Sequence, residues 1–198
     1  MKIPFDLTLA LHSDAGVTPN DSIVGTLAIY TLKCEGLRKM SDGLDRMACR
    51  RFAQTVQDEV VNDIRADFNP DWARRELWDR SYSESRTSDT PAVLLELLSH
   101  QNLADMKYGH DPAFKFTVCR AVYKGMLKYL SELYGCRYVV QPLPVKNFSV
   151  DFCGENKARL CWEDTEDPKE KTAVPDGYTV YTRIDDGAFD SGLDVKGK

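Results

Sequence analysis

The most constraining feature of the sequence is a run from Pro91 to Leu98 that is apolar except for one glutamate, Glu96. A short, almost continuously apolar run predicts a strand that is buried on both faces of a sheet. Burial of a carboxylate is costly unless it meets a cation, a metal ion or a proton. Glu96 is therefore a candidate general base with a raised pKa. The alternatives are a buried ion pair with Arg86 or a strand end that reaches water.

A second strand is predicted from Leu7 to Leu11, where leucines alternate with other residues. It ends in the polar loop His12 to Gly16, and ligands of open α/β sheets bind at such strand ends. His12 is a candidate metal ligand, because the strand fixes its backbone while the loop leaves room for a substrate. A hydrogen-bonded structural histidine is the alternative. The run from Val24 to Leu32 predicts a neighbouring strand.

Two amphipathic patterns predict helices on this sheet. Apolar residues recur every four positions over 44–64, and we expect Ser41 or Asp42 to cap that helix. The second helix begins with the capping pair Asp111-Pro112, and its apolar face continues to a glycine stop at residue 135. Between the two patterns, the stretch that ends near residue 90 has little periodicity and is predicted to run over the surface, as functional loops do.

Two further histidines and one arginine are candidates for the same site. His100 follows Glu96 by four residues, which suits two ligands on one helical face, but the predicted strand breaks that geometry. His100 or His110 could thus ligate a metal or have a structural or solvent-facing role. Arginines between residues 74 and 86 are typical of a solvated face. Arg86 is the exception that we single out for substrate binding, because it precedes the Glu96 strand by a turn.

The pattern changes near residue 142 from helices to closely spaced short strands. These strands are predicted at 147–153, 157–162 and 177–184, and a polar, glycine-containing stretch follows them. We therefore expect two domains, an α/β domain at 1–141 and an all-β domain at 142–198.

Composition excludes several classes of protein. The 198 residues contain 26 Lys and Arg against 31 Asp and Glu, a net charge of −5, which argues against a nucleic-acid binder. No apolar run reaches the ~18 residues of a transmembrane helix, and the first residues do not form a signal peptide. The six cysteines lack a CxxC pair and are expected to be mostly buried thiols.

Two segments resemble the zinc-dependent N-acetylmuramoyl-L-alanine amidases of bacterial cell walls. They are LTLALHSDAG at residues 7–16 and PAVLLELLSHQN at residues 91–102, and the resemblance spans roughly residues 1–134. It implies an incomplete amidase-type mixed sheet flanked by helices. It also implies that His12 is the last zinc ligand and that Glu96 is the catalytic glutamate, which takes a proton from the zinc-bound water and returns it to the leaving amine.

The same resemblance implies that part of the site is missing. The family takes a histidine and a glutamate ligand from a region before the His12 strand, whereas only eleven residues precede His12 here. We therefore expect an inactive fragment, or a degenerate copy, that lacks the first strand, the first helix and two zinc ligands. Residues 143–198 resemble the first half of a fibronectin type III module, a partial all-β sandwich.

These resemblances imply Zn²⁺ as cofactor, peptidoglycan or another cell-envelope glycan as partner, and a location in the cell envelope, periplasmic or secreted. The alternative is a non-catalytic relative that binds the cell wall or a carbohydrate. A third possibility is a polysaccharide (xanthan) lyase, although the sequence offers no Tyr or His base beside a group that neutralises a carboxylate.

Overall fold

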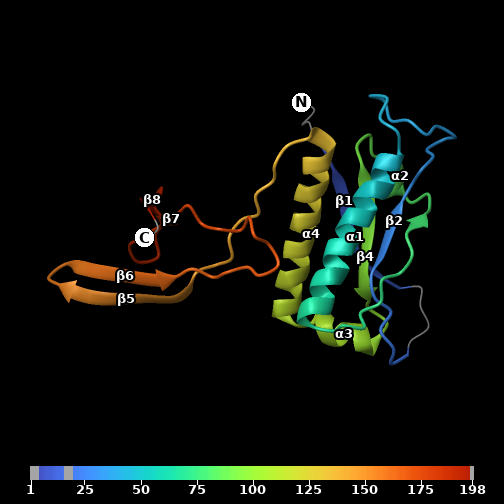
Figure 1. Ribbon diagram of the computed structural model, residues 1–198. Helices are drawn as coiled ribbons and strands as arrows, with labels where there is room; N and C mark the ends of the chain where they lie inside the picture. The colour runs from blue at the N-terminus through green and yellow to red at the C-terminus, as the bar shows by residue number, and fades with distance from the viewer. Residues whose placement is uncertain (1–4, 16–19, 197–198) are drawn as a thin grey trace. The chain divides into compact units, whose positions relative to one another are not determined.

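The computed structural model describes residues 5–15 and 20–196. The chain divides into two compact units, Met1–Cys136 and Arg137–Lys198, and each is described by itself (Figure 1). The polar loop predicted after His12 extends to Gly16, which lies outside the described residues.

The first unit is an α/β domain with a mixed sheet. Its elements in chain order are β1 (Thr8–Asp14), β2 (Leu27–Tyr30), α1 (Met47–Asp67), β3 (Trp78–Asp79), α2 (Ser83–Arg86), β4 (Ala92–Ser99), α3 (Leu103–Gly109) and α4 (Pro112–Tyr134). The strand order is β1-β4-β2-β3. β4 runs parallel to β1 and antiparallel to β2, while β2 and β3 are parallel. The predicted α/β class with a mixed sheet flanked by helices is confirmed.

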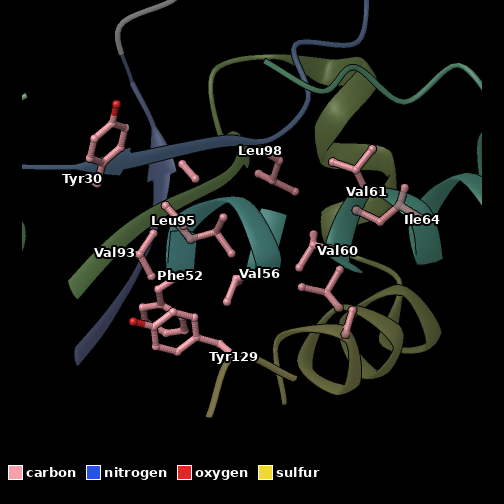
Figure 2. Packing of buried hydrophobic residues seen from close by; sticks show 14 of the residues in the cluster. Tyr30, Phe52, Val56, Val60, Val61, Ile64, Val93, Leu95, Leu98 and Tyr129 are labelled. Carbon is pink, nitrogen blue, oxygen red and sulfur yellow. The ribbon is translucent and has the colours of Figure 1, made fainter. Parts of the chain in front are cut away.

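The core forms because β4 is apolar on both faces. Val93 and Leu95 point to the face that packs against α1 and α4, which lie side by side (Figure 1). Figure 2 shows this cluster, where Phe52 of α1 and Tyr129 of α4 lie together below the strands. Leu94 points to the opposite face and is buried there with β2 side chains. Glu96 is the next residue of β4 that points to this second face, so its carboxylate lies at the border of an apolar layer.

The two long helices begin differently. Asp111 caps α4 by accepting a hydrogen bond from the Ala113 N–H at 2.8 Å, and a left-handed glycine follows the last turn, as predicted. The predicted cap of α1 is wrong, because α1 begins at Met47 after Arg46, with no side-chain cap. Asp42 instead accepts from the Leu44 N–H at 2.9 Å, which stabilises the preceding turn. None of the helices within 5–15 and 20–196 is long and apolar enough to cross a membrane.

The stretch before residue 90 is more deeply buried than predicted. Trp72 is fully buried, and its indole N–H donates to the Thr26 hydroxyl at 2.9 Å. Ser85 of α2 is also buried and shares a 2.7 Å hydrogen bond with Thr31. The prediction of a purely surface path is therefore wrong, because isolated side chains anchor the segment to the sheet without any periodic pattern.

The second unit contains two small antiparallel sheets. One pairs β5 (Lys146–Gly154) with β6 (Lys157–Glu163), and the other pairs β7 (Gly177–Val180) with β8 (Leu193–Lys196). The rings of Trp162 and Tyr178 meet edge to face at 5.1 Å between centroids and connect the sheets. β8 was not predicted, because its residues lie in a polar stretch. The two sheets are compatible with a partial β module.

The cysteines are more exposed than predicted. All six are free thiols, and four of them are exposed: Cys119, Cys136, Cys153 and Cys161. Only Cys49 is buried. The expectation of mostly buried thiols is wrong, since the hairpin β5–β6 and the outer face of α4 leave their cysteines facing water.

Candidate functional site

The structure brings His12 and Glu96 together at one edge of the sheet. They are register partners on the parallel strands β1 and β4, whose backbones lie about 4.8 Å apart in such a pair. Paired positions point to the same face, which here is the face of Leu94 and not the face covered by α1 and α4. Both side chains lie near the C-terminal ends of their strands, where open α/β sheets bind ligands.

Glu96 has the environment of a proton acceptor. Its Oε2 atom is buried and has no hydrogen-bond partner within residues 5–15 and 20–196. Burial raises the pKa of Glu96, and the nearby Asp14 carboxylate raises it further. The His12 imidazole, the Arg75 guanidinium and the His100 imidazole lower the pKa of Glu96 in opposition to these two effects. A carboxylate whose pKa is raised toward neutrality is a better general base than an exposed one.

An ion pair between Asp14 and Arg75 lies beside Glu96. The Arg75 guanidinium donates to Asp14 Oδ2 at 2.5 Å, and both side chains are mostly buried. Sequence analysis missed both residues. The sequence gives only a weak indication that Asp14 belongs to the site, which is its position two residues after His12 at the end of β1. Arg75 is 61 positions away from Asp14, and only tertiary structure places it there. Arg75 is thus one of the groups that lower the pKa of Glu96.

Arg86 lies elsewhere on the same unit. It is the last residue of α2, and its guanidinium donates to the Ser81 hydroxyl at 3.2 Å. No ion pair joins it to Glu96 in the part of the chain that the structure describes. The ion pair considered from the sequence is therefore not formed, because α2 directs a different side chain, Glu84, toward the strand ends.

Glu84 and His12 form a second close pair. The distance from Glu84 Oε1 to His12 Nε2 is 3.5 Å, and each side chain is 41% exposed. Hydrogen bonds from its own backbone and from Ser83 lower the pKa of Glu84, and the charge of His12 lowers it further. Glu84 had no signal in the sequence, since the helix that carries it has only four residues.

The other two histidines differ in position. His100 follows β4 directly, and its Nδ1 atom lies 2.9 Å from the Ser13 hydroxyl, which makes it part of the cluster at the end of β1. Its backbone N–H also donates to the Asp14 carbonyl at 3.2 Å. His110 is the exposed C-cap of α3, and within the described ranges no hydrogen bond or ion pair joins its side chain to this cluster.

The described residues do not by themselves fit a zinc ion. Across 5–15 and 20–196, no group of three or more His, Cys, Asp or Glu side chains is arranged to hold a metal. A catalytic zinc ion normally takes three protein ligands and a water molecule. His12 offers one imidazole beside the unpaired Glu96 oxygen, while the Asp14 carboxylate is bound to Arg75. The cluster thus contains a candidate base and several potential ligand side chains, but the described residues are not arranged as a ligand set.

A cavity of about 580 Å³ lies next to His12. This volume is in the usual range for small-molecule sites. Its walls combine apolar side chains of β1, β4, α3 and α4 with a polar rim; the lining residues are Leu11, His12, Ser13, Leu97, Leu98, His100, Met106, Gly109, Phe114 and Lys115. The cavity therefore offers a binding space beside the His12 imidazole.

The sequence matches one protein family, and the structure is similar to solved amidases. Residues 2–128 match the family described as N-acetylmuramoyl-L-alanine amidase. The structure is similar to an N-acetylmuramoyl-L-alanine amidase from Clostridium difficile 630, with 21% identity and a TM-score of 0.51, over 64% of this chain and 58% of that one. It is also similar to the CwlD amidase of Clostridioides difficile, solved in complex with the GerS lipoprotein, with 18% identity and a TM-score of 0.50, over 64% of this chain and 55% of that one.

These similarities concern the fold, because both identities are low. The chain spans little more than half of the length of the two solved amidases. None of the curated proteins matches the sequence well enough to count as a relative.

Proposed function

Because the chain belongs to the N-acetylmuramoyl-L-alanine amidase family, we propose that it takes part in hydrolysis of the amide bond between N-acetylmuramic acid and L-alanine in peptidoglycan. The observation that supports this most directly is the register pairing of His12 with Glu96. This pairing places a candidate metal ligand and a candidate base side by side, near the strand ends at which open α/β sheets bind their ligands.

Glu96 is the general base in this proposal. Its partly buried carboxylate accepts a proton from the attacking water and returns it to the nitrogen of the departing amine. The buried Oε2 atom without a partner is suited to this, since no hydrogen bond within the described chain competes for it. The Asp14–Arg75 ion pair acts as a positioning pair that links the end of β1 to the segment beside β2, on the other side of the Glu96 strand. Arg86 is proposed as a substrate-binding residue.

Zinc enters as the cofactor that the family implies. When bound, the metal would polarise the amide carbonyl and lower the pKa of a water molecule. The His12 imidazole would be one of its ligands, and the remaining ligands would have to come from a polypeptide segment other than the described residues. We further propose that the protein acts in the cell envelope, periplasmic or secreted, and that residues 142–198 form a fibronectin type III-like module that contacts glycans or proteins.

A second candidate function is binding to the cell wall without hydrolysis. The observation that favours it is the absence, among the described side chains, of a complete metal-ligand set. In that case Glu96 would have a structural role, and its replacement would leave peptidoglycan binding unchanged. Hydrolysis of peptidoglycan by the unmodified protein separates the two candidates.

The test compares Glu96→Gln with the unmodified protein, both purified from the native cells together with any polypeptide that accompanies them. Glutamine keeps the volume but cannot accept the proton, so we expect hydrolysis of peptidoglycan to fall by ~100-fold or more. The zinc content should not change, because Glu96 is proposed as a base and not as a ligand.

Glu132→Gln, which replaces an exposed glutamate of α4, is the matched control and should hydrolyse normally. If Glu96→Gln is as active as the control, the proposed catalytic role is wrong. If it loses the metal, Glu96 is a ligand. If even the unmodified protein shows no hydrolysis but binds peptidoglycan, the second candidate function is correct.

A further inference from the structure

An exposed tryptophan on β3, Trp78, has two arginine side chains over its ring. The guanidinium carbon of Arg75 lies 5.3 Å from the centre of the Trp78 ring, and that of Arg80 lies 5.6 Å from it. The Trp78 residue is 38% exposed although an indole is among the most strongly buried side chains in proteins. Two cations on one exposed ring therefore call for a functional explanation.

Trp78 lies on the same face of the sheet as Glu96. It is the register partner of Ile29 on β2, and Ile29 is the partner of Leu94 on β4. Leu94 and Glu96 are two positions apart on β4, so their side chains share a face. The tryptophan and the candidate base are thus on one surface, opposite to the helices α1 and α4.

Arg75 connects the tryptophan to the candidate site. The same guanidinium that contacts the Trp78 ring binds the carboxylate of Asp14, and the Asp14 charge acts on Glu96. The aromatic ring is consequently separated from the catalytic cluster by a single guanidinium group.

Arg80 differs from Arg75 in its partners. Arg75 is neutralised by Asp14. The Arg80 guanidinium makes no ion pair with a carboxylate of the described chain, and it donates one hydrogen bond, to the Asp79 carbonyl at 3.0 Å. A guanidinium has five N–H donors in a planar fork that matches a carboxylate. Stacking on Trp78 holds the fork in place, so less side-chain entropy is lost when an anion binds.

We propose that Trp78 and Arg80 form a carboxylate-binding subsite, which holds the peptide part of the substrate next to Glu96. The inference rests on the proposed function, because it takes the substrate to be a glycopeptide. The Arg80 fork pairs with a free carboxylate of the peptide, and the Trp78 ring packs against the adjoining apolar or sugar surface. The subsite thereby selects glycopeptides with a free carboxylate over their amidated forms.

The test measures binding without turnover. Calorimetric titration uses the full chain with Glu96→Gln and two probes, N-acetylmuramoyl-L-alanyl-glutamate with free carboxylates and the same compound with its carboxylates converted to amides. We expect the free acid to bind about tenfold more tightly than the amide. Arg80→Gln should remove this preference, and Arg80→Lys should restore part of it, because the charge returns without the fork. Trp78→Leu should weaken both probes.

Arg183→Gln is the matched control, because Arg183 also stacks on an aromatic ring, Phe189 at 5.5 Å, but belongs to the second unit. It should bind both probes as the parent does. Three results would each overturn the subsite. The parent could bind acid and amide equally, the acid preference could survive Arg80→Gln, or neither probe could bind at millimolar concentration. If the acid preference depends on Arg80 but the unmodified protein hydrolyses no peptidoglycan, the subsite is supported and the proposed hydrolysis is rejected.

Discussion

His12 and Glu96 occupy the same register position on the neighbouring parallel strands β1 and β4. Because side chains alternate along a strand, a slip of one residue would place the two groups on opposite faces of the sheet. The apolar residues before them prevent such a slip, since Leu9 and Leu95 must both face the helices. Burial of the core therefore fixes the geometry of the candidate site.

Zinc binding by the purified 198-residue chain should be weak. Tight zinc sites depend on a full ligand set, which the described residues lack. After dialysis against metal-free buffer, elemental analysis should find far less than one zinc ion per chain, and His12→Ala should weaken any residual binding seen in a zinc titration. One tightly held ion per chain that is indifferent to His12→Ala would contradict this expectation.

Gly25→Ala should destabilise the first unit strongly. Gly25 has a φ of 78°, and an added Cβ would overlap the Ala73 carbonyl oxygen, which accepts the hydrogen bond from the Thr26 N–H. We expect the free energy of unfolding in urea to fall by about 3 kcal/mol or more. Gly36→Ala is the matched control, since its φ is 82° but its surroundings are open. It should cost only about 1 kcal/mol, and equal losses would refute the steric explanation.

Lys124→Met should also be costly. The Lys124 side chain is 2% exposed, and its ammonium group lies 2.7 Å from Asp63 and 3.6 Å from Glu59 of α1. Methionine removes the buried ammonium group beside the Asp63 and Glu59 carboxylates, so the free energy of unfolding should fall by about 3 to 5 kcal/mol. Lys128→Met removes a more exposed partner of Glu59 and should cost about 1 kcal/mol or less. Thermal and urea unfolding of the two variants measures the difference, which should vanish if burial is unimportant.

Tyr129→Phe should make the protein more stable and less sensitive to alkali. Burial raises the pKa of Tyr129 to about 12, and its hydroxyl has no hydrogen-bond partner among the described residues. In the unfolded chain this tyrosine ionises at about pH 10, whereas in the folded protein it stays neutral up to about pH 12. Its titration therefore costs no stability below pH 10, and the free energy of unfolding falls as the pH rises from about 10 to about 12. At pH 7 the phenylalanine should add about 1 kcal/mol, since a buried, unpaired hydroxyl is removed.

Urea unfolding at pH 7 and at pH 11 checks this expectation. The parent should lose more stability between the two values than Tyr129→Phe does, whereas the exposed Tyr82→Phe should behave as the parent. If the parent and Tyr129→Phe lose stability equally, the Tyr129 hydroxyl does not control the alkaline transition.

The sequence alone determined the elements whose signals are local and periodic. The apolar run around Leu94 predicted β4, the alternating leucines before His12 predicted β1, and the residue pair Asp111-Pro112 predicted the start of α4. These predictions succeeded because burial of one face, or of both, imposes a pattern that neighbouring residues must share. His12 and Glu96 were found in the same way, as polar residues at the ends of apolar strands.

Only the tertiary structure decided which other groups surround these two residues. Asp14 meets Arg75 across 61 positions of sequence, and Glu84 reaches His12 from a helix of four residues. Trp72 is buried although the segment that carries it was predicted to lie on the surface. Such contacts depend on single side chains brought together by strand pairing, so no local period records them. Periodicity determines which residues enter the core, whereas the charges around the candidate base depend on how distant segments pack.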